Sequence, residues 1–312
     1  MTAALVSIGT NSTRLLVQDG EHRRAAESRG TRLGAGITES GAIDPAARRR
    51  TLAVIDEYVA AARRCGAATI DAIATSALRR ASDGEAFGTE VAARVGIPPR
   101  VLGGEEEATY SFLGATANRR ASERVVAVLD VGGGSAELAV DAPAHARAAG
   151  RVAHVFSVEV GAVRLSERHP ALLGARALDR AERRALEDEA RADAAHVLAP
   201  YGGVRGFGEL LVVGGTAFTA AAMVAGGVRD GAKMTRGDCA RLVEQLLARD
   251  LESRRALAHI RPQRADILPG GLIVVDEACR LLGVDAFTVS EADLLLGYLT
   301  SPAFRAVPLA PA

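Results

Sequence analysis

The chain has 312 residues, in which 38 Lys and Arg residues are balanced by 38 Asp and Glu residues. A hydrophobic content of 48% and a charged content of 24% are typical of a globular protein and exclude wholesale disorder. The zero net charge gives no general attraction to nucleic acid or to an acidic membrane surface. Lys233 is the only lysine, and codon bias is a simpler explanation of the Arg-rich, Ala-rich composition than function. We therefore expect neither nucleic acid nor a membrane as a partner.

The cysteines and histidines indicate neither a disulfide framework nor a zinc site. Cys65, Cys239 and Cys279 are far apart and form no CxxC pair, which fits a reducing compartment. The six histidines form no HExxH-type cluster. The apolar run at residues 3–6 is too short for a signal peptide, and no apolar stretch reaches the roughly 20 residues that span a membrane. These features predict a soluble, cytoplasmic protein.

Two segments, residues 4–17 and 126–140, repeat one design about 120 residues apart. Each has an apolar run rich in β-branched residues, a Gly-rich polar turn and a second apolar run, which predicts a β-hairpin. Superposing the first glycines of the two turns aligns three pairs of residues: Gly9 with Gly132, Ser12 with Ser135, and Ser7 with Asp130. The repeat predicts two halves of similar architecture facing each other across a cleft. We place the domains at residues 1–120 and 121–312, with the junction within residues 117–124.

The other predicted elements alternate between helices and strands. Hydrophobic periodicity predicts helices over residues 45–64, 85–94, 105–118, 178–198, 238–251 and 272–282, and another after residue 216. Strands are expected at residues 70–74, 101–102, 210–213 and 286–289. Ser82 and Glu85 form a candidate capping box for the second helix. This pattern predicts the α/β class with a mixed sheet in each half. The Pro-rich end is expected to be a loose tail or to pack back on the first domain.

Three Gly-rich turns follow predicted strands, at residues 9–12, 132–135 and 214–216. Such turns aim backbone N–H groups into one concavity that suits phosphate oxygens, although a lone turn of this kind is more simply a tight hairpin. Two of the three also carry hydroxyl or amide side chains in register, which favours an anion clamp. The candidate phosphate-binding residues are Gly9, Thr10, Asn11, Ser12, Gly132, Gly133, Gly134, Ser135, Gly215 and Thr216.

Carboxylates flank the second turn and begin one predicted helix. Asp130 precedes the turn and Glu137 follows it, and paired carboxylates can hold Mg²⁺. The alternatives are a turn-capping role for Asp130 and a solvent-facing position for Glu137. Residues 105–107 are three glutamates at a helix start, where they either cap the helix or supply a base that activates water.

Residues 75–80 end a predicted strand with two hydroxyl groups and two arginines, Arg79 and Arg80. A fork of guanidinium donors suits a polyanion, and a solvated loop is the alternative.

These motifs resemble those of the exopolyphosphatase / guanosine pentaphosphate phosphohydrolase (Ppx/GppA) family, within the sugar kinase, Hsp70 and actin superfamily. The most specific match is Asp-x-Gly-Gly-Gly-Ser-x-Glu, over residues 130–137. The others follow in the family's order, so that the resemblance covers nearly the whole chain: residues 7–15, 74–79, 104–108, 157–165, 215–216, 264–270 and 289–290. The chain is similar to the short members, which have no C-terminal helical domain.

The resemblance implies two actin-like domains with mixed sheets around an active-site cleft. It also implies Mg²⁺-dependent hydrolysis of a terminal phosphoanhydride, either of inorganic polyphosphate or of pppGpp, which gives ppGpp. By position, the family's catalytic base falls on Glu107 and its metal-associated acids fall on Asp130 and Glu137. Arg14 and Arg79 join the Gly-rich turns as phosphate ligands. Dimers are common in the family, which leaves a homodimer open.

Two departures from the family's motifs favour an alternative function. The first phosphate motif normally begins with Asp, and here that residue is Ser7. An Arg-Glu pair near the C-terminus is replaced by Leu295 and Leu296. Both changes favour a sensor that binds polyphosphate or a guanosine nucleotide without turnover, whereas the retained carboxylates favour an enzyme. The Gly-Glu-Glu-Glu-Ala segment argues against an actin-like ATPase or a sugar kinase. Polyphosphate versus pppGpp, chain-length preference and oligomeric state stay open.

Overall fold

The computed structural model of the protein describes residues 1–117, 119, 125–141, 152–227 and 230–309, and these residues form two mixed sheets. The first sheet has the order β12-β4-β1-β2-β3, with β5 paired to β4. Its strands are β1 (Thr2–Ile8), β2 (Thr13–Asp19), β3 (His22–Arg29), β4 (Thr69–Ala74), β5 (Arg100–Val101) and β12 (Val307–Pro308). The second sheet has the order β10-β11-β9-β6-β7-β8. Its strands are β6 (Val126–Val131), β7 (Ala136–Asp141), β8 (Val152–Val158), β9 (Glu209–Val213), β10 (Lys233–Thr235) and β11 (Ala286–Val289).

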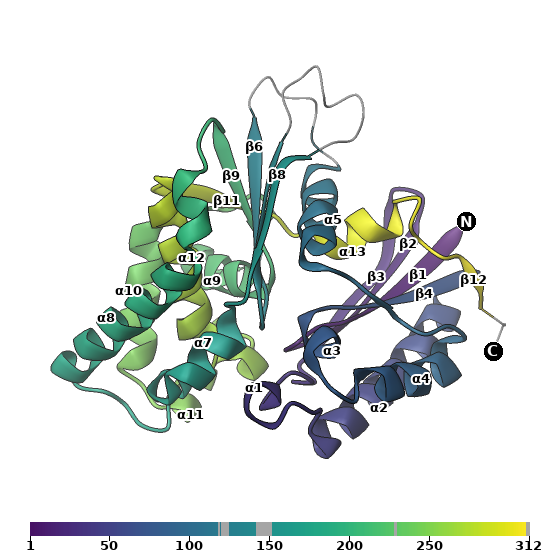
Figure 1. Ribbon diagram of the computed structural model, residues 1–312, viewed down its shortest axis with the longest axis horizontal. Coiled ribbons are helices and arrows are strands. Elements are labelled where there is room, and N and C mark those ends of the chain that lie inside the picture. Colours follow the sequence, from purple (N-terminus) through teal and green to yellow (C-terminus); the bar gives the residue numbers. More distant parts are fainter. Residues whose placement is uncertain (118, 120–124, 142–151, 228–229, 310–312) are drawn as a thin grey trace.

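The two sheets share one topology. In the first, β1, β2 and β3 are antiparallel neighbours and β4 joins β1 in parallel; β6, β7, β8 and β9 repeat this arrangement. The β1–β2 and β6–β7 turns have the same closing hydrogen bond. The Gly9 amide donates to the Ser12 carbonyl at 2.9 Å, and the Gly132 amide donates to the Ser135 carbonyl at 3.0 Å. The predicted pair of similar α/β halves is therefore confirmed (Figure 1). The predicted junction at residues 117–124 lies largely outside the described residues.

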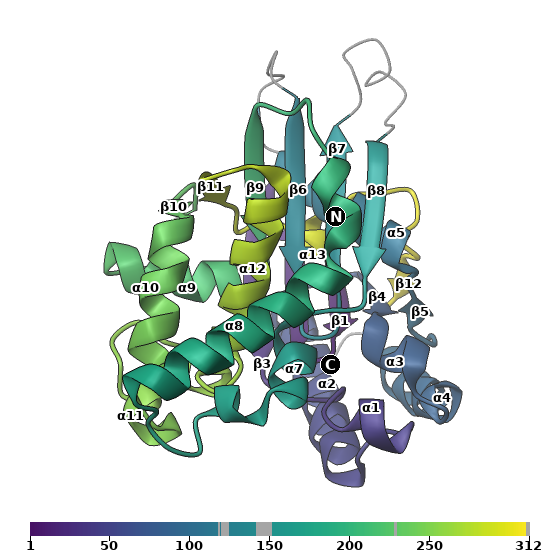
Figure 2. The ribbon, with the colours of Figure 1, turned by 60° about the vertical axis from the view of Figure 1, so that its left-hand side comes forward.

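Helices cover the outer face of each sheet. On the first sheet, the buried faces of α2 (Pro45–Arg64) and α4 (Gly84–Val95) join the core formed by β1, β2 and β4. On the second sheet, the core includes the buried faces of three helices, α8 (Arg180–Val197), α10 (Arg236–Leu247) and α12 (Leu268–Leu282) (Figure 2). The shorter helices are α1 (Ile37–Ser40), α3 (Ser76–Arg80), α7 (Ala162–Arg168), α9 (Gly215–Ala225) and α11 (Leu251–Arg255). None of the helices among the described residues combines the length and apolar character needed to cross a membrane.

Two helices, α5 (Gly104–Thr116) and α13 (Leu294–Leu299), lie between the halves (Figure 1). The apolar side of α5 packs on β6, β7 and β9, while α13 packs on β1, β2 and β4. The helices meet at Gly114 and Gly297, where a Cβ added to Gly297 would lie 1.9 Å from the carbonyl oxygen of Tyr110. Glycine is required at this crossing because the two backbones touch.

Three local features differ from the sequence-based expectations or add to them. Strand β3 is not predicted because it is an exposed edge strand of charged residues and alanine without hydrophobic alternation. The predicted capping box at Ser82 is wrong, because α4 begins after Asp83. The Asp83 carboxylate instead accepts hydrogen bonds from the Ile43 amide and the Arg48 guanidinium, each at 3.0 Å. Near the C-terminus, β12 pairs with β4 and the Leu309 amide donates to Ala68 at 2.9 Å.

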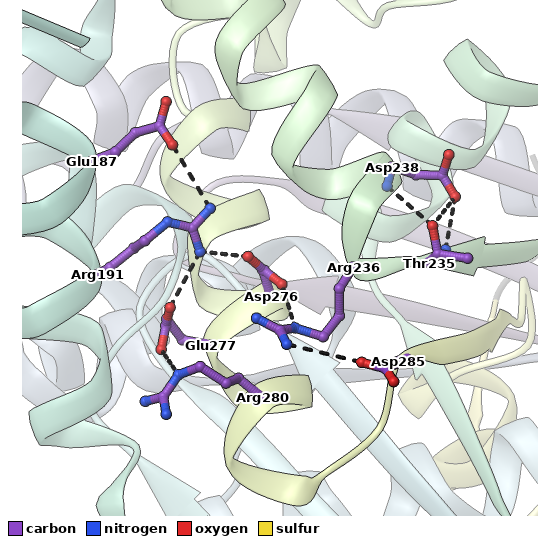
Figure 3. Close-up of polar contacts among 9 residues, drawn as sticks. All are labelled: Glu187, Arg191, Thr235, Arg236, Asp238, Asp276, Glu277, Arg280 and Asp285. Atoms are coloured by element: carbon purple, nitrogen blue, oxygen red, sulfur yellow. Dashed lines mark hydrogen bonds and ion pairs between the residues drawn. The ribbon is translucent and has the colours of Figure 1, made fainter. Parts of the chain in front are cut away.

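An ion-pair network joins α8 to α12 (Figure 3). Asp276 and Glu277 on α12 are both buried, and one Arg191 nitrogen contacts both carboxylates. Each acid has a second arginine, with Arg236 2.7 Å from Asp276 and Arg280 2.6 Å from Glu277. Buried carboxylates need such partners because an unpaired charge is costly in a poorly solvated site.

We expect Arg191→Met to lower the free energy of unfolding by about 2 kcal/mol. The loss is moderate because each acid keeps one arginine. Urea denaturation measures it, with Arg24→Met, which removes an exposed ion pair to Asp19, as a control of small effect. A loss equal to that of the control would contradict this role for Arg191.

Candidate active site

Asp130 and Glu137 are directly opposite each other in the β6–β7 hairpin. Like charges in this position destabilise a sheet unless something compensates for them. Asp130 accepts a hydrogen bond from the Ser111 hydroxyl at 2.6 Å, and Glu137, which is buried, accepts one from Ser157 at 3.0 Å. A turn-capping role for Asp130 and a solvent-facing position for Glu137 are therefore both wrong.

The three glutamates at the start of α5 point in different directions. Glu105 is exposed, and Glu106 accepts a hydrogen bond from the Gly103 amide at 2.9 Å, so the helix-capping explanation holds for Glu106. Glu107 is buried and accepts a hydrogen bond from Arg79 at 2.7 Å. Arg79 belongs to α3, so the expected alternative of a solvated loop over residues 75–80 is wrong.

The electrostatics connect three carboxylates, of which Glu107 and Glu137 are buried and Asp130 is half-buried. Burial, and next the charge of Asp293, raises the pKa of Asp130 to about 6. Burial raises the pKa of Glu137 well above its ordinary value, and the charges of Glu107 and Asp130 add to this effect. The pKa of Glu107 is also raised, mainly by burial, although Arg79 opposes the shift. The trio therefore lies close enough together for each charge to affect the others, and a cation would relieve the repulsion.

The donor set fits Mg²⁺ better than a metal that needs a complete protein cage. Among the described residues, no group of three or more His, Cys, Asp or Glu side chains is arranged to hold a metal ion. Mg²⁺ is usually held by one or two carboxylates, while water and substrate phosphates supply its other ligands. Asp130 and Glu137 offer such a pair, and the magnesium site stays a prediction.

The three predicted Gly-rich turns converge beside these carboxylates. Gly214 has φ 95°, and a Cβ added there would lie 3.0 Å from Asp130 Oδ1, so both backbone conformation and space require glycine. A Cβ added to Gly133 would lie 3.1 Å from Thr10 Cβ, which places the tips of the first two turns in contact. The Oδ1 atom of Asn11 at this contact is buried and has no hydrogen-bond partner among the described residues. Orphaned polar atoms of this kind occur where a ligand or water is missing. Three polar residues of the turns, Ser12, Ser135 and Thr216, are buried.

A cavity of about 620 Å³ opens between the two halves next to the third turn. Gly214, Gly215, Arg14, Arg261 and Arg264 line one part of it. In the part of the chain that the structure describes, Arg264 has no ion pair, and it donates one hydrogen bond, to the Ser12 hydroxyl at 3.2 Å. Burial, and then the charges of three arginines, lower the pKa of Arg264 to about 10; those arginines are Arg261, Arg14 and Arg32. Carboxylates line other parts of the cavity, but the part of its wall around Arg264 holds a cation without an ion pair among the described residues, which suits a polyanion.

Sequence reasoning did not place Arg261 or Arg264 in the site. The signal was present, because Arg264 begins one of the segments on which the family resemblance rests, residues 264–270. Arg14, which was predicted as a phosphate ligand, lines the cavity but is already paired with Asp293 at 2.7 Å. Glu107 and Glu137 do not line the cavity.

We expect Arg264→Met to weaken the binding of inorganic polyphosphate by about 10- to 100-fold, because it removes a charged donor from the cavity wall. Isothermal titration calorimetry measures this change. Arg241→Met, which removes an exposed arginine of α10, is the control and should bind as the wild type does. Unchanged affinity in Arg264→Met would show that the substrate does not use this wall.

Of the three residues that depart from the family's motifs, two line this cavity and the third, Ser7, lies opposite a residue that does. Ser7 is buried and directly opposite Arg14 in the β1–β2 hairpin. Leu295 packs in the apolar cluster beneath α13, and both Leu295 and Leu296 line the cavity. Together with Phe218 they give its wall an apolar part beside the arginines.

Comparison with known proteins is consistent with this geometry. A model of the Ppx/GppA phosphatase family matches residues 18–303. The chain belongs to this family. Exopolyphosphatase 2 of Mycobacterium tuberculosis is 31% identical over 96% of this chain and 97% of its own length. A guanosine-5'-triphosphate,3'-diphosphate pyrophosphatase of Vibrio vulnificus is 26% identical over 94% of this chain and 58% of its own length. The expected membership of a phosphatase family is thereby confirmed.

Solved structures of this family have the same fold. An exopolyphosphatase-like protein has a TM-score of 0.85 and 27% identity, covering 97% of this chain and 99% of its own. An exopolyphosphatase from Cytophaga hutchinsonii has a TM-score of 0.79 and 23% identity, covering 96% of both chains. The predicted fold class, α/β with a mixed sheet in each of two halves, is therefore confirmed.

Proposed function

We propose that this Ppx/GppA family member is a Mg²⁺-dependent exopolyphosphatase that removes terminal phosphates from inorganic polyphosphate. The observation that carries the proposal is the carboxylate trio, which at Asp130 meets the Gly214 turn of the cavity, together with Arg264, which has no ion pair among the described residues. The similarity to exopolyphosphatase 2 over nearly the full length of both chains supports the same substrate class.

In the proposed reaction, Glu107 accepts the proton of a water molecule that attacks the terminal phosphorus in line with the leaving oxygen. Its raised pKa suits this role, because an effective general base has a pKa near the working pH. Arg79 holds one carboxylate oxygen of Glu107 and so leaves the other free to face the water. Arg264 and the Gly214–Gly215 turn bind the rest of the chain. A Mg²⁺ ion held by Asp130 and Glu137 would neutralise charge on the phosphates.

A second candidate substrate is pppGpp. The observation in its favour is the apolar part of the cavity wall, formed by Phe218, Leu295 and Leu296. A purine base can pack against such side chains, whereas a bare phosphate chain gains nothing from them.

The test measures Mg²⁺-dependent release of phosphate from long-chain polyphosphate and, separately, from pppGpp. Faster release from polyphosphate supports the proposal, and faster release from pppGpp supports the second candidate. EDTA should stop the reaction and excess Mg²⁺ should restore it. Absence of release from both, with polyphosphate still bound, would instead support the sensor that Ser7 and the Leu295–Leu296 pair favour.

A further inference from the structure

The two equivalent hairpins differ most at one cross-strand pair. In the second hairpin this pair is Asp130 and Glu137, whereas the first hairpin has Ser7 and Arg14 at the same positions. Residues directly opposite in an antiparallel pair have Cβ atoms about 4.5–5.5 Å apart. An acid at position 7 would therefore start beside the Arg14 side chain and could pair with it, whereas Ser7 has no charge to offer.

The counter-ion of Arg14 comes instead from the start of α13. Asp293 Oδ2 lies 2.7 Å from Arg14 Nη1, and the Asp293 side chain is buried. Burial is the largest single effect on the pKa of Arg14 and lowers it, but the charge and hydrogen bond of Asp293, with a smaller contribution from Asp130, together raise that pKa. The same carboxylate contributes to the raised pKa of Asp130. Asp293 thus interacts electrostatically with a residue of each hairpin, Arg14 in the first and Asp130 in the second. An acid at position 7 would pair with the same arginine.

The position of Asp293 is fixed by the fold. Its Oδ1 atom accepts a hydrogen bond from the Leu295 amide at 3.1 Å and so caps α13. That helix is in turn held against α5 by the backbone contact at Gly297. Both Asp293 and Arg14 line the cavity next to Gly214. The fold therefore fixes the position of the Asp293 carboxylate, and this carboxylate holds the Arg14 guanidinium in the cavity wall.

We propose that Asp293 is a positioning residue that replaces the acid absent at position 7 and holds Arg14 toward the substrate phosphates. The proposal relies on the proposed function only for the choice of ligand. Helix capping alone would also place an aspartate here, and the two roles are separable, because asparagine caps a helix as well as aspartate does but carries no charge.

The test compares the wild type with Asp293→Asn, Ser7→Asp and the double variant, using inorganic tripolyphosphate as the ligand in calorimetry without metal. We expect Asp293→Asn to weaken binding about 10-fold, and Ser7→Asp in the same chain to restore it to within about threefold of the wild type. Ser7→Asp alone should bring no gain, because Arg14 then has two carboxylates. Unchanged affinity in Asp293→Asn, or a double variant no tighter than Asp293→Asn, would overturn the proposal.

A double-mutant cycle tests whether Asp293 acts through Arg14. In an Arg14→Gln background, Asp293→Asn should cause no further loss of affinity, and a second tenfold loss would overturn the proposal. Asp266→Asn is the matched control, because Asp266 is another buried acid and accepts from an arginine of the opposite half, Arg32, at 2.6 Å. Ser7→Asp should not restore the affinity of Asp266→Asn.

The same variants separate this proposal from the proposed function. If the wild type binds no tripolyphosphate, the proposed function fails, and the thermal unfolding midpoints then decide the role of Asp293. Ser7→Asp should raise the midpoint of Asp293→Asn, or restore folding if that variant does not fold. A midpoint that stays the same or falls would overturn the proposal.

Discussion

Replacing Glu107 with glutamine should reduce phosphate release by about 10²- to 10⁴-fold while polyphosphate binding stays close to that of the wild type. Glutamine has the same shape as glutamate and can still accept a hydrogen bond from Arg79, but it cannot take a proton from water. The reduction should appear in kcat, because the cavity that binds the phosphate chain is not lined by Glu107. Steady-state phosphate release and calorimetry with the same polyphosphate measure the two quantities.

Glu106→Gln is the matched control for this prediction. Glu106 is the neighbouring residue on α5, caps the helix and forms an ion pair with Arg100, so its substitution should change turnover by no more than about threefold. If Glu107→Gln kept more than a tenth of the wild-type turnover, another group would have to be the base.

Replacing Arg305 with methionine should lower the free energy of unfolding by about 3–5 kcal/mol. Asp71 on β4 is fully buried, and Arg305 binds its Oδ1 atom through Nη2 at 2.6 Å and Nε at 3.0 Å. Without this side chain, the partners of the Asp71 carboxylate among the described residues are uncharged donors, such as the Tyr298 hydroxyl at 3.0 Å. Urea denaturation of the wild type and the variant measures the difference.

The control for Arg305 is the double variant with Asp71→Asn. Asparagine removes the buried charge, so the double variant should be more stable than Arg305→Met alone. Equal stability of the two variants, or a loss under 1 kcal/mol in Arg305→Met, would mean that the pair contributes little to the fold.

Local patterns predicted the parts of the fold and site that depend on neighbouring residues. A Gly-rich turn between two β-branched runs fixes its own hairpin register, so the alignment of Ser7 with Asp130 followed from the sequence. The three glutamates of α5 show the limit of such reasoning. Successive helical residues are about 100° apart, and only the packing of α5 on the second sheet decides that Glu107 faces inward.

The residues that sequence reasoning missed come from distant loops. Arg261 and Arg264 precede α12, and Asp293 precedes α13, yet all three meet the first hairpin across the space between the halves. No periodicity relates them to Ser12 or Arg14, because their approach is set by the packing of both sheets. Asp293 in particular lies at a position where no motif predicted an acid.

The ion pair between Asp71 and Arg305 also bears on the synthesis of the protein. Chains emerge from the ribosome N-terminal end first, and domains generally fold as they appear. Here the first sheet receives its last strand, β12, and the partner of its buried acid from residues that follow the whole second sheet. The N-terminal half therefore cannot complete its sheet or neutralise Asp71 when residues of its own half have been made. It can do so only after the second half has been synthesised.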